Sequence, residues 1–290
     1  MPVFVTGGTG YIGASVVREL VRRGKVVRGL ARSVAASEKL RELGAVPVRG
    51  ELRDKALLLD EAANAGAVVH IAFEQSAEGV AIDRAALEIF VDAMRDQRPL
   101  VYTSGVWVYG SRGDVVLDEA SALDPLAICA WRPAHEEIVL EAKRLRGVVI
   151  RPGVVYGDGG GIVGGMIEGA RNAPVRVVGN GMNRWATIRH DALAELFGSV
   201  VDTPRARGIY NAVRGASVPY VEVARAAARA GGGDGSIEHI GLEEARTVMG
   251  PFADALTADQ NVSSQRAERD LGWAPHRPSL LEELGNTTVV

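Results

Sequence analysis

Short apolar runs rich in β-branched residues recur through the first half of the chain, and most of the segments between them are long enough to form helices. Runs of this kind predict buried strands. The predicted strands are Val3–Thr6, Val26–Leu30, Val46–Arg49, Val68–Ala72, Leu100–Ser104 and Val148–Pro152. Strands that alternate with helices form right-handed crossovers, so their carboxyl ends lie along one edge of a parallel sheet with helices on both faces. The pattern predicts a doubly wound α/β fold whose ligands bind at that edge.

The pattern changes after Gly153. The segment that follows contains a glycine-rich stretch, two short apolar runs, a helical pattern and a further strand, at 157–161, 175–178, 185–189, 191–201 and 209–213 respectively. The last two are expected to return to the main sheet. We therefore predict a main α/β domain that consists of residues 1–153 and about 188–214. A smaller C-terminal lobe, expected to bind the substrate, consists of about 154–187 and 215–290.

The composition indicates a protein that acts on a small molecule. The chain has 290 residues, 47% of them hydrophobic, which is enough to bury a sizeable core. Its 33 basic and 36 acidic residues give a net charge of -3, and they form neither a basic patch for nucleic acid nor a polybasic membrane anchor. The single cysteine, Cys129, excludes an internal disulfide, and the five histidines lack the spacing of metal ligands. No apolar run approaches the roughly 18 residues that span a bilayer, and the first strand begins too early for a signal peptide, so a cytoplasmic protein is expected.

The first predicted strand runs directly into a glycine-rich loop. Residues 3–13 read VFVTGGTGYIG and lead into a helical pattern over 11–23. Gly7 suits a tight turn, Gly10 lets the backbone approach a pyrophosphate, and Gly13 lets the helix pack on the strand. The amides at the start of the helix then point at the negative charge. The segment predicts a bound nicotinamide dinucleotide in a Rossmann-type domain, with Tyr11 and Ile12 beside it.

The end of the second predicted strand bears on the type of cofactor. An NAD site usually carries a carboxylate about 20 residues beyond the glycine loop, where it binds the hydroxyls of the adenosine ribose. This chain has Ala31-Arg32-Ser33 there instead. A guanidinium and a hydroxyl suit a 2′-phosphate, so Arg32 and Ser33 predict NADP rather than NAD. The alternative is that Arg32 is a solvated loop cation. Arg53 is a further candidate, whose direction the sequence does not give.

Ordered motifs extend over nearly the whole chain. They are the loop at 6–13, GELRD at 50–54, VHIA at 69–72, YTSG at 102–105 with VYG at 108–110, RPGVVYG at 151–157, RHD at 189–191 and LGWAP at 271–275. In this order they resemble the motifs of the extended short-chain dehydrogenase/reductases, often called NAD-dependent epimerase/dehydratases. The resemblance implies a Rossmann-type doubly wound parallel sheet with a small C-terminal substrate lobe.

The same resemblance implies positions for the cofactor. Leu52 is expected beside the adenine, and Ile71 and Ala72 beside the ribose and pyrophosphate. Further cofactor contacts are expected from Thr103, Arg132, Pro152, Val154 and Val155, with the segment 152–155 beside the nicotinamide. The alternative for each of these residues is an ordinary position at the end of a strand.

The reaction centre departs from the family pattern. In the family, a Ser or Thr and a Tyr-x-x-x-Lys helix form this centre, and the tyrosine hydroxyl exchanges a proton with the substrate oxygen. Counted back from Glu136-Glu137, the lysine position falls on Arg132 and the tyrosine position on Ile128. Isoleucine cannot transfer a proton. Pro133 predicts that the helix begins near Arg132, so the match of Ile128 to the tyrosine is only approximate.

The remaining candidates for the chemistry are polar side chains near the expected cleft. The serine position falls on Gly105 or, in another register, on Ser104, which is expected to hydrogen-bond the cofactor or a substrate carbonyl. Arg132 is a fixed cation that binds rather than donates a proton. The candidate proton donors are Ser104, Tyr109, Tyr156 and His135, with packing roles as the alternative for the aromatic rings. Trp107, Trp131 and Trp185 either line an apolar substrate pocket or pack in the core.

Three functions fit these residues. The first is an NADP(H)-dependent oxidoreductase that acts on a carbonyl or alcohol of a small-molecule substrate, oriented by Arg132 and Ser104. The second is an epimerase or dehydratase with transient hydride transfer, which needs a base such as Tyr109 or His135. The third is a catalytically inactive redox sensor that binds NADP(H). By analogy with the family, a homodimer is expected, paired through helices near 81–97 and 134–146.

Overall fold

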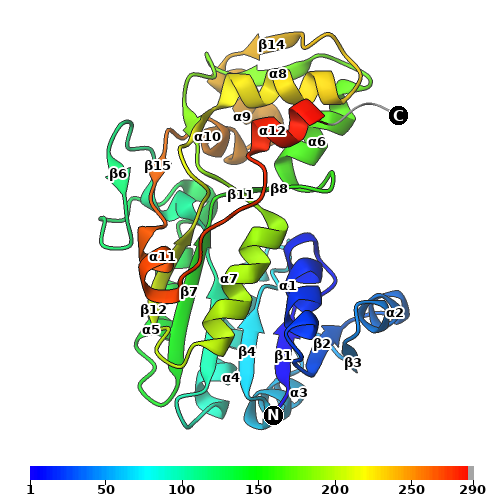
Figure 1. The fold of residues 1–290 in the computed structure, drawn as a ribbon, viewed down its shortest axis with the longest axis vertical. Helices are drawn as coiled ribbons and strands as arrows, with labels where there is room; N and C mark the ends of the chain where they lie inside the picture. Colours follow the sequence, from blue (N-terminus) through cyan, green and yellow to red (C-terminus); the bar gives the residue numbers. More distant parts are fainter. Residues whose placement is uncertain (287–290) are drawn as a thin grey trace.

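A seven-stranded parallel sheet forms the larger part of the molecule, with the strand order β12-β7-β5-β4-β1-β2-β3 (Figure 1). The structure is a computed structural model and describes residues 1–286. The strands of this sheet are β1 Val3–Thr6, β2 Val27–Ala31, β3 Val46–Arg49, β4 Ala67–His70, β5 Pro99–Thr103, β7 Arg146–Pro152 and β12 Gly208–Ala212. All of the pairings in this sheet are parallel. The predicted Rossmann-type α/β fold is therefore confirmed.

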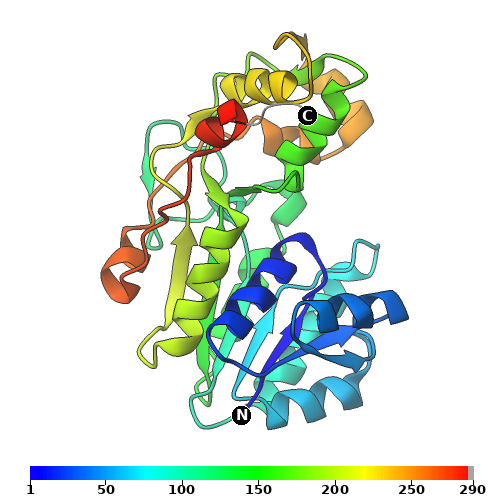
Figure 2. The same cartoon turned by 45° about the vertical axis from the view of Figure 1, so that its right-hand side comes forward.

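Helices cover both faces of this sheet, because successive strand residues point to opposite sides. Val3 and Val5 of β1 contribute to the hydrophobic core on one face, whereas Phe4 contributes to the core on the other. One face carries α1 Tyr11–Arg22, α2 Val34–Glu42 and α7 His190–Asp202. The opposite face carries α3 Lys55–Asn64, α4 Gly79–Ala93 and α5 Arg132–Leu140. Figure 2 shows α1 and α7 lying together against the sheet.

A smaller lobe lies beyond the carboxyl ends of the strands, at the top of Figure 1, and has its own hydrophobic core. Its short strands pair as β8 Val154–Tyr156 with β11 Thr187–Arg189, β9 Val175–Val178 with β14 Ile237–Ile240, and β10 Arg184–Trp185 with β13 Val218–Pro219. Its helices are α6 Gly161–Ala170, α8 Tyr220–Ala230, α9 Leu242–Met249, α10 Phe252–Leu256 and α12 Leu280–Asn286. The boundaries of the predicted domains stay a prediction.

Further segments connect the lobe to the sheet. The 3₁₀ turns η1 Val106–Tyr109 and η2 Ala127–Cys129 follow β5, and β6 Val116–Leu117 pairs with β15 Asn261–Val262. After β15, helix α11 Gln265–Leu271 returns to the main sheet. There Ala267 and Trp273 join the core of the sheet, and the Trp273 indole N–H donates to the Ala192 carbonyl at 2.9 Å. Part of the segment 215–290, which was predicted to belong to the lobe, thus packs against the main sheet. Within the part of the chain that the structure describes, no helix is long and apolar enough to cross a bilayer.

Two predicted strands, Val3–Thr6 and Val46–Arg49, have the observed bounds, and the others differ by one or two residues at their ends. The difference matters after β4, which ends at His70 rather than at Ala72. The Ile71 amide donates to the Thr6 carbonyl at 3.3 Å, and the chain then turns past Gly7. Ile71 and Ala72 therefore lie at the edge of the sheet, where ligands of such folds bind.

Candidate cofactor and substrate site

The glycine loop after β1 is closely packed by backbone on both sides. Gly7 has a positive φ of 75°, and a Cβ atom placed there would lie 2.6 Å from the Ala72 amide nitrogen. A Cβ atom on Gly13 would collide with the Gly7 carbonyl oxygen. Helix α1 begins with Gly10 at its N-cap, and no side chain caps it. Its first-turn amides have no carbonyl partner within the helix, so they are available to an anion such as a pyrophosphate.

A cavity of about 620 Å³ opens beside this loop, at the carboxyl ends of the first four strands. The predicted cofactor residues that line it are Gly7, Gly10, Tyr11, Ile12, Gly13, Arg32, Leu52, Ile71 and Ala72. The structure thus brings together residues from four separate segments of the sequence. Sequence reasoning did not single out the further lining residues Thr9, Leu30, Gly50, Glu51, Phe73 and Glu74. Of these, Thr9, Gly50 and Glu51 lie within the quoted motifs, Phe73 and Glu74 follow the motif at 69–72, and Leu30 ends a predicted strand. We call this space the first cavity.

Arg32 and Ser33, both predicted to bind a 2′-phosphate, take different positions. The Arg32 side chain is exposed and lines the first cavity, and no hydrogen bond or ion pair is found for it among residues 1–286. The Ser33 hydroxyl instead caps helix α2, where it accepts a hydrogen bond from the Ala36 amide at 3.1 Å. Ser33 does not line the cavity. Of the predicted pair, the structure therefore offers only the guanidinium to a ligand.

Arg53 also lines the first cavity, but its guanidinium is held by two carboxylates. Its Nη2 lies 2.8 Å from Glu74 Oε1 and its Nη1 lies 2.5 Å from Glu78 Oε2. Hydrogen bonds from Arg53 and Ser76 hold the pKa of Glu74 below its ordinary value. Arg53 and Glu74 thus form an ion pair at the cavity rim, whereas Arg32 has no hydrogen bond or ion pair among residues 1–286, although its charge also contributes to lowering the pKa of Glu74.

Tyr11 joins the first cavity to the smaller lobe. Its hydroxyl donates to the Gly157 carbonyl at 2.8 Å, and burial raises its pKa further above neutrality. A Cβ atom on Gly160 would collide with the Tyr11 ring. The glycine-rich stretch at 157–161 therefore provides the close approach that lets the lobe pack on the cofactor loop.

A second cavity of about 210 Å³ adjoins the first, and Ile12 lines both. Its other lining residues are Ser104, Gly105, Val106, Trp107, Cys129, Arg132, Pro152, Gly153, Val154, Val155 and Ile162. They come from η1, η2, the start of α5, the β7–β8 turn and α6. Most are apolar, so this cavity suits a small and largely apolar molecule.

Arg132 is the charged side chain in this lining, and its position is fixed by several contacts. The helix α5 begins at Arg132 with Pro133 in its first turn, as the sequence predicts. Arg132 Nη1 donates to the Thr103 carbonyl at 2.7 Å and to the Tyr102 hydroxyl at 3.3 Å. The guanidinium carbon lies 4.5 Å from the centre of the Trp131 ring, in cation–π geometry. Arg132 is therefore held rigidly at the end of β5.

Two hydroxyls at the end of β5 are buried and have no observed hydrogen-bond partner among the described residues. They are Thr103 Oγ1 and Ser104 Oγ, and Ser104 is 6% exposed. A buried hydroxyl without a partner destabilises a fold by about 1–3 kcal/mol, so such groups commonly serve a ligand. Because Ser104 lines the second cavity, its hydroxyl is available to a substrate or cofactor oxygen.

Tyr109 and His135 lie outside the linings of both cavities. Tyr109 is buried, and its hydroxyl donates to Asn211 Oδ1 and accepts from Arg151 Nη1, both at 2.8 Å. Burial raises the pKa of this hydroxyl. His135 is 2% exposed, and its Nδ1 lies 2.7 Å from Asp83 Oδ2. The positions of Tyr109 and His135 thus give no support to their predicted part in proton transfer.

Tyr156, the other aromatic candidate for proton donation, also lies outside the linings of both cavities. Its hydroxyl donates to the Pro278 carbonyl at 2.7 Å.

Asp83 is the centre of the buried network that holds His135. Its carboxylate also lies 3.2 Å from His70 Nε2 and accepts from the Tyr102 hydroxyl at 3.1 Å. Although burial raises the pKa of Asp83, the hydrogen bonds with His135 and His70 outweigh it and hold this pKa well below its ordinary value. The network thereby supports Tyr102, which in turn contacts Arg132.

Cys129 lines the second cavity, which sequence reasoning did not foresee. It ends the 3₁₀ turn η2 and lies three residues before Arg132, which begins α5 and lines the same cavity. Ile128, at the expected tyrosine position, is 38% exposed and does not line the cavity. Pro133 was the sequence signal for this difference. Because Pro133 predicts a helix that begins near Arg132, residue 128 lies before the helix, and the four-residue helical spacing of the family motif does not apply to it.

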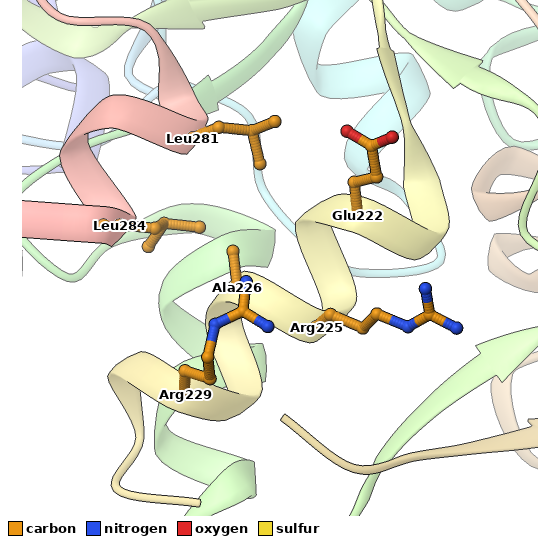
Figure 3. A pocket seen from close by; sticks show the side chains of 7 residues that line it. Glu222, Arg225, Ala226, Arg229, Leu281 and Leu284 are labelled. Atoms are coloured by element: carbon orange, nitrogen blue, oxygen red, sulfur yellow. The ribbon is translucent and has the colours of Figure 1, made fainter. Parts of the chain in front are cut away.

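A third cavity, of about 280 Å³, lies between α8 and α12. Figure 3 shows Arg225 and Arg229 of α8 and the leucines Leu281 and Leu284 of α12 around it. It contains none of the predicted site residues, and both arginines are exposed. No cluster of three or more potential metal-ligating side chains exists among residues 1–286.

Solved structures and known sequences resemble this chain over almost its full length. The dTDP-glucose 4,6-dehydratase DesIV of Streptomyces venezuelae, solved with NAD bound, superposes with a TM-score of 0.83 at 20% identity, covering 99% of this chain and 96% of that one. An uncharacterised protein of Schizosaccharomyces pombe is 30% identical, with 99% of both chains covered. A 4-hydroxy-2-methyl-3-oxo-4-farnesyl-3,4-dihydroquinoline-1-oxide ketoreductase of Stigmatella aurantiaca is 32% identical over 62% of this chain and 58% of its own.

A family model defines the group to which these similarities belong. The model of the NAD dependent epimerase/dehydratase family matches residues 3–212, which contain the glycine loop, β4 and the segment 152–155. The matched residues include the strands of the main sheet from β1 to β12 and all lining residues of the first and second cavities. The chain therefore belongs to the NAD-dependent epimerase/dehydratase family, whose members use a nicotinamide dinucleotide as oxidoreductases, epimerases or dehydratases.

Proposed function

We propose that the protein is an NADP(H)-dependent oxidoreductase that acts on the carbonyl or alcohol group of a small, largely apolar substrate. The observation that carries this proposal is that two cavities lie side by side and share the lining residue Ile12. The first is lined by the glycine loop, and the second is lined by apolar side chains together with the polar groups Ser104 and Arg132. A cofactor laid along the first cavity would present its reactive end at the second.

The residues of the first cavity fit a dinucleotide. Gly7 and Gly13 leave room that a Cβ atom would fill, and the uncapped start of α1 faces the space beside them. Leu52 offers an apolar side chain for the adenine, and Pro152, Val154 and Val155 offer apolar contacts for the nicotinamide. When bound, the cofactor supplies or accepts the hydride of the reaction.

Arg32 supports the choice of NADP over NAD. A 2′-phosphate needs a cation with free N–H groups, and the guanidinium of Arg32 is exposed at the cavity with no hydrogen bond to any residue that the structure describes. The carboxylate of Glu74 in the same lining is held by Arg53 and is therefore not offered to a ribose. Ser33 is not part of this proposal, because its hydroxyl caps α2.

The polar groups of the second cavity can position a carbonyl. Ser104 offers a hydroxyl without a partner, and Arg132 offers a guanidinium whose position is fixed by Thr103 and Trp131. A carbonyl oxygen bound by both groups would carry its developing negative charge beside a cation, which stabilises the transition state of reduction. Removal of water by the surrounding apolar side chains strengthens this interaction.

Nucleotide-sugar epimerisation has less support. The second cavity has one charged lining residue, Arg132, among the residues that the structure describes, and the lining shows no second cluster of cations for a diphosphate. The name of the Stigmatella relative, a ketoreductase, also favours carbonyl reduction.

Titration of the purified protein with NADPH and with NADH, followed by fluorescence, tests the proposal. We expect NADPH to bind at least about tenfold more tightly, because a charged hydrogen-bonded pair contributes about 1.5–3 kcal/mol. Arg32→Ala should abolish the preference without weakening NADH binding. Arg41→Ala is the matched control, because Arg41 is an exposed arginine of α2 outside the cavity. Equal binding of the two nucleotides by the unaltered protein would overturn the NADP assignment, and failure to bind either would overturn the proposed function.

A further inference from the structure

The second cavity contains a thiol at the place where the proposed reaction lacks a proton donor. Cys129 ends the 3₁₀ turn η2, is 5% exposed and lines the cavity. Its amide donates to the Leu126 carbonyl at 2.8 Å, which fixes the turn. Arg132, the first residue of α5, follows three residues later and lines the same cavity.

An independent feature indicates that a ligand binds next to this thiol. Ser104, which lines the same cavity, is 6% exposed and its Oγ has no hydrogen-bond partner among residues 1–286. A substrate oxygen bound by Ser104 would satisfy this group. The cavity thus combines an unpaired hydroxyl, a fixed cation and a thiol in a space of about 210 Å³.

Burial and the charge of Arg132 have opposite effects on the pKa of the Cys129 thiol. Burial raises the pKa of Cys129 to about 11, and the charge of Arg132 opposes this increase. The other ionisable groups nearby are Glu136, whose carboxylate is paired with Arg151, and Tyr109, which belongs to the same hydrophobic cluster. The thiol is therefore protonated near neutral pH, and a thiolate formed there would be stabilised by the Arg132 cation.

We propose that Cys129 is the residue that exchanges a proton with the substrate oxygen. This inference rests on the proposed function. In reduction, the carbonyl carbon accepts a hydride from the reduced nicotinamide while the carbonyl oxygen accepts the proton of the Cys129 thiol. The products are the alcohol, the oxidised nucleotide and a Cys129 thiolate beside Arg132, and the thiolate regains a proton from water. In oxidation, the thiolate accepts the hydroxyl proton as the hydride leaves the alcohol carbon.

Alkylation of Cys129 tests the position of the thiol without any turnover. The protein is loaded with NADP⁺ and treated with iodoacetamide, a small neutral reagent, and modification is followed by mass spectrometry. Because the thiolate is the reactive form, we expect the rate to rise about tenfold per pH unit from pH 7 to pH 10. Saturating acetophenone or 2-octanone should slow the reaction at least about tenfold. A rate that these ketones leave unchanged would overturn the inference.

Kinetics of two adjacent substitutions test the role of the thiol. In NADPH-dependent reduction of a panel of uncharged ketones that begins with acetophenone and 2-octanone, Cys129→Ala should lower kcat about 100-fold or more and leave the Kd for NADPH unchanged. Ile128→Ala, at the exposed neighbouring position, should keep the activity of the unaltered protein. The rise of the oxidation rate with pH, measured with 1-phenylethanol, should disappear in Cys129→Ala.

The possible failures are distinguishable. Full activity of Cys129→Ala, or an unchanged pH profile, would overturn the role of Cys129 and leave the proposed function intact. An unaltered protein that binds NADPH but reduces none of the ketones would overturn the proposed function itself. Loss of activity in Ile128→Ala equal to that in Cys129→Ala would show that the turn, rather than the thiol, is required, and would also overturn the inference.

Discussion

The two adjoining cavities differ in the part of the chain that shapes them. The first cavity is shaped by backbone atoms. Gly7, Gly13 and the amides at the start of α1 form its wall, and the ends of the strands hold this loop in position. Side chains shape the second, where Ser104 and Arg132 come from segments far apart in the sequence. Cofactor binding and the reaction should therefore respond to different substitutions.

The largest effect is expected for Gly13→Val, which acts on the backbone-made cavity. Its branched side chain would collide with the Gly7 carbonyl and displace the loop from the pyrophosphate position. We expect the Kd for NADPH to rise about 1000-fold, which corresponds to about 4 kcal/mol. Gly169→Ala, in α6, is the control, because nothing lies within 4 Å of a Cβ atom placed at Gly169. Nucleotide affinity close to that of the unaltered protein in a folded Gly13→Val variant would refute the pyrophosphate site.

Arg132→Met should have the next largest effect and should act on the second cavity. The substitution keeps an apolar chain of similar reach but removes the cation and the hydrogen bond to the Thr103 carbonyl. We expect kcat for ketone reduction to fall about 100-fold while the Kd for NADPH changes less than about fivefold. Arg84→Met, at an exposed position of α4, provides the matched control. If nucleotide affinity fell as much as kcat, the separation between the two cavities would be wrong.

Asp83→Asn tests the buried network that supports the second cavity. Its pKa is held below the ordinary value of about 4, so the carboxylate stabilises the fold fully above about pH 4. This stabilisation is lost as the pH falls through the folded-state pKa. We expect the variant to lose about 2 kcal/mol of unfolding free energy at pH 7, because Tyr102 and two histidines lose a charged partner.

Urea unfolding at pH 7 and at pH 3 measures this difference. The difference in unfolding free energy between the unaltered protein and Asp83→Asn should narrow at the lower pH, because pH 3 is below the ordinary pKa of the carboxyl and Asp83 then binds a proton in the unfolded chain. A gap that widens toward acid would contradict the direction of the Asp83 shift.

The smallest effect is expected for Ser33→Ala, which separates a structural role from a cofactor role. Loss of the α2 cap should lower the free energy of unfolding by about 1 kcal/mol. The Kd for NADPH should change less than about twofold, in contrast to Arg32→Ala. A larger loss of NADPH affinity than in Arg32→Ala would restore Ser33 to the 2′-phosphate site that the sequence predicted.

The sequence predicts the fold and the first cavity well, because both depend on local patterns. The predicted strands alternate with helices, and the spacing of Gly7, Gly10 and Gly13 is sufficient to locate the glycine loop that lines the first cavity. Ser33 shows the limit of this reasoning, since a residue adjacent to a cofactor loop can equally cap the next helix. Sequence spacing alone does not give the direction of a side chain.

The second cavity is less accessible to sequence reasoning. Residue counting placed the tyrosine position on Ile128, but the 3₁₀ turn η2 exposes Ile128 and turns Cys129 toward the cavity. His135 shares a helix with Arg132, yet the buried carboxylate of Asp83, from a different helix, holds it outside the cavity. Such choices depend on contacts between distant segments, which local patterns do not record.

A crystal structure of the complex with NADP⁺ tests the central claim most directly. We expect the pyrophosphate at the amides of α1, the 2′-phosphate at Arg32, and the nicotinamide between Ser104 and the segment 152–155, with its reactive face open to the second cavity. A nucleotide whose nicotinamide lies away from the second cavity, or whose 2′-phosphate lies away from Arg32, would contradict it.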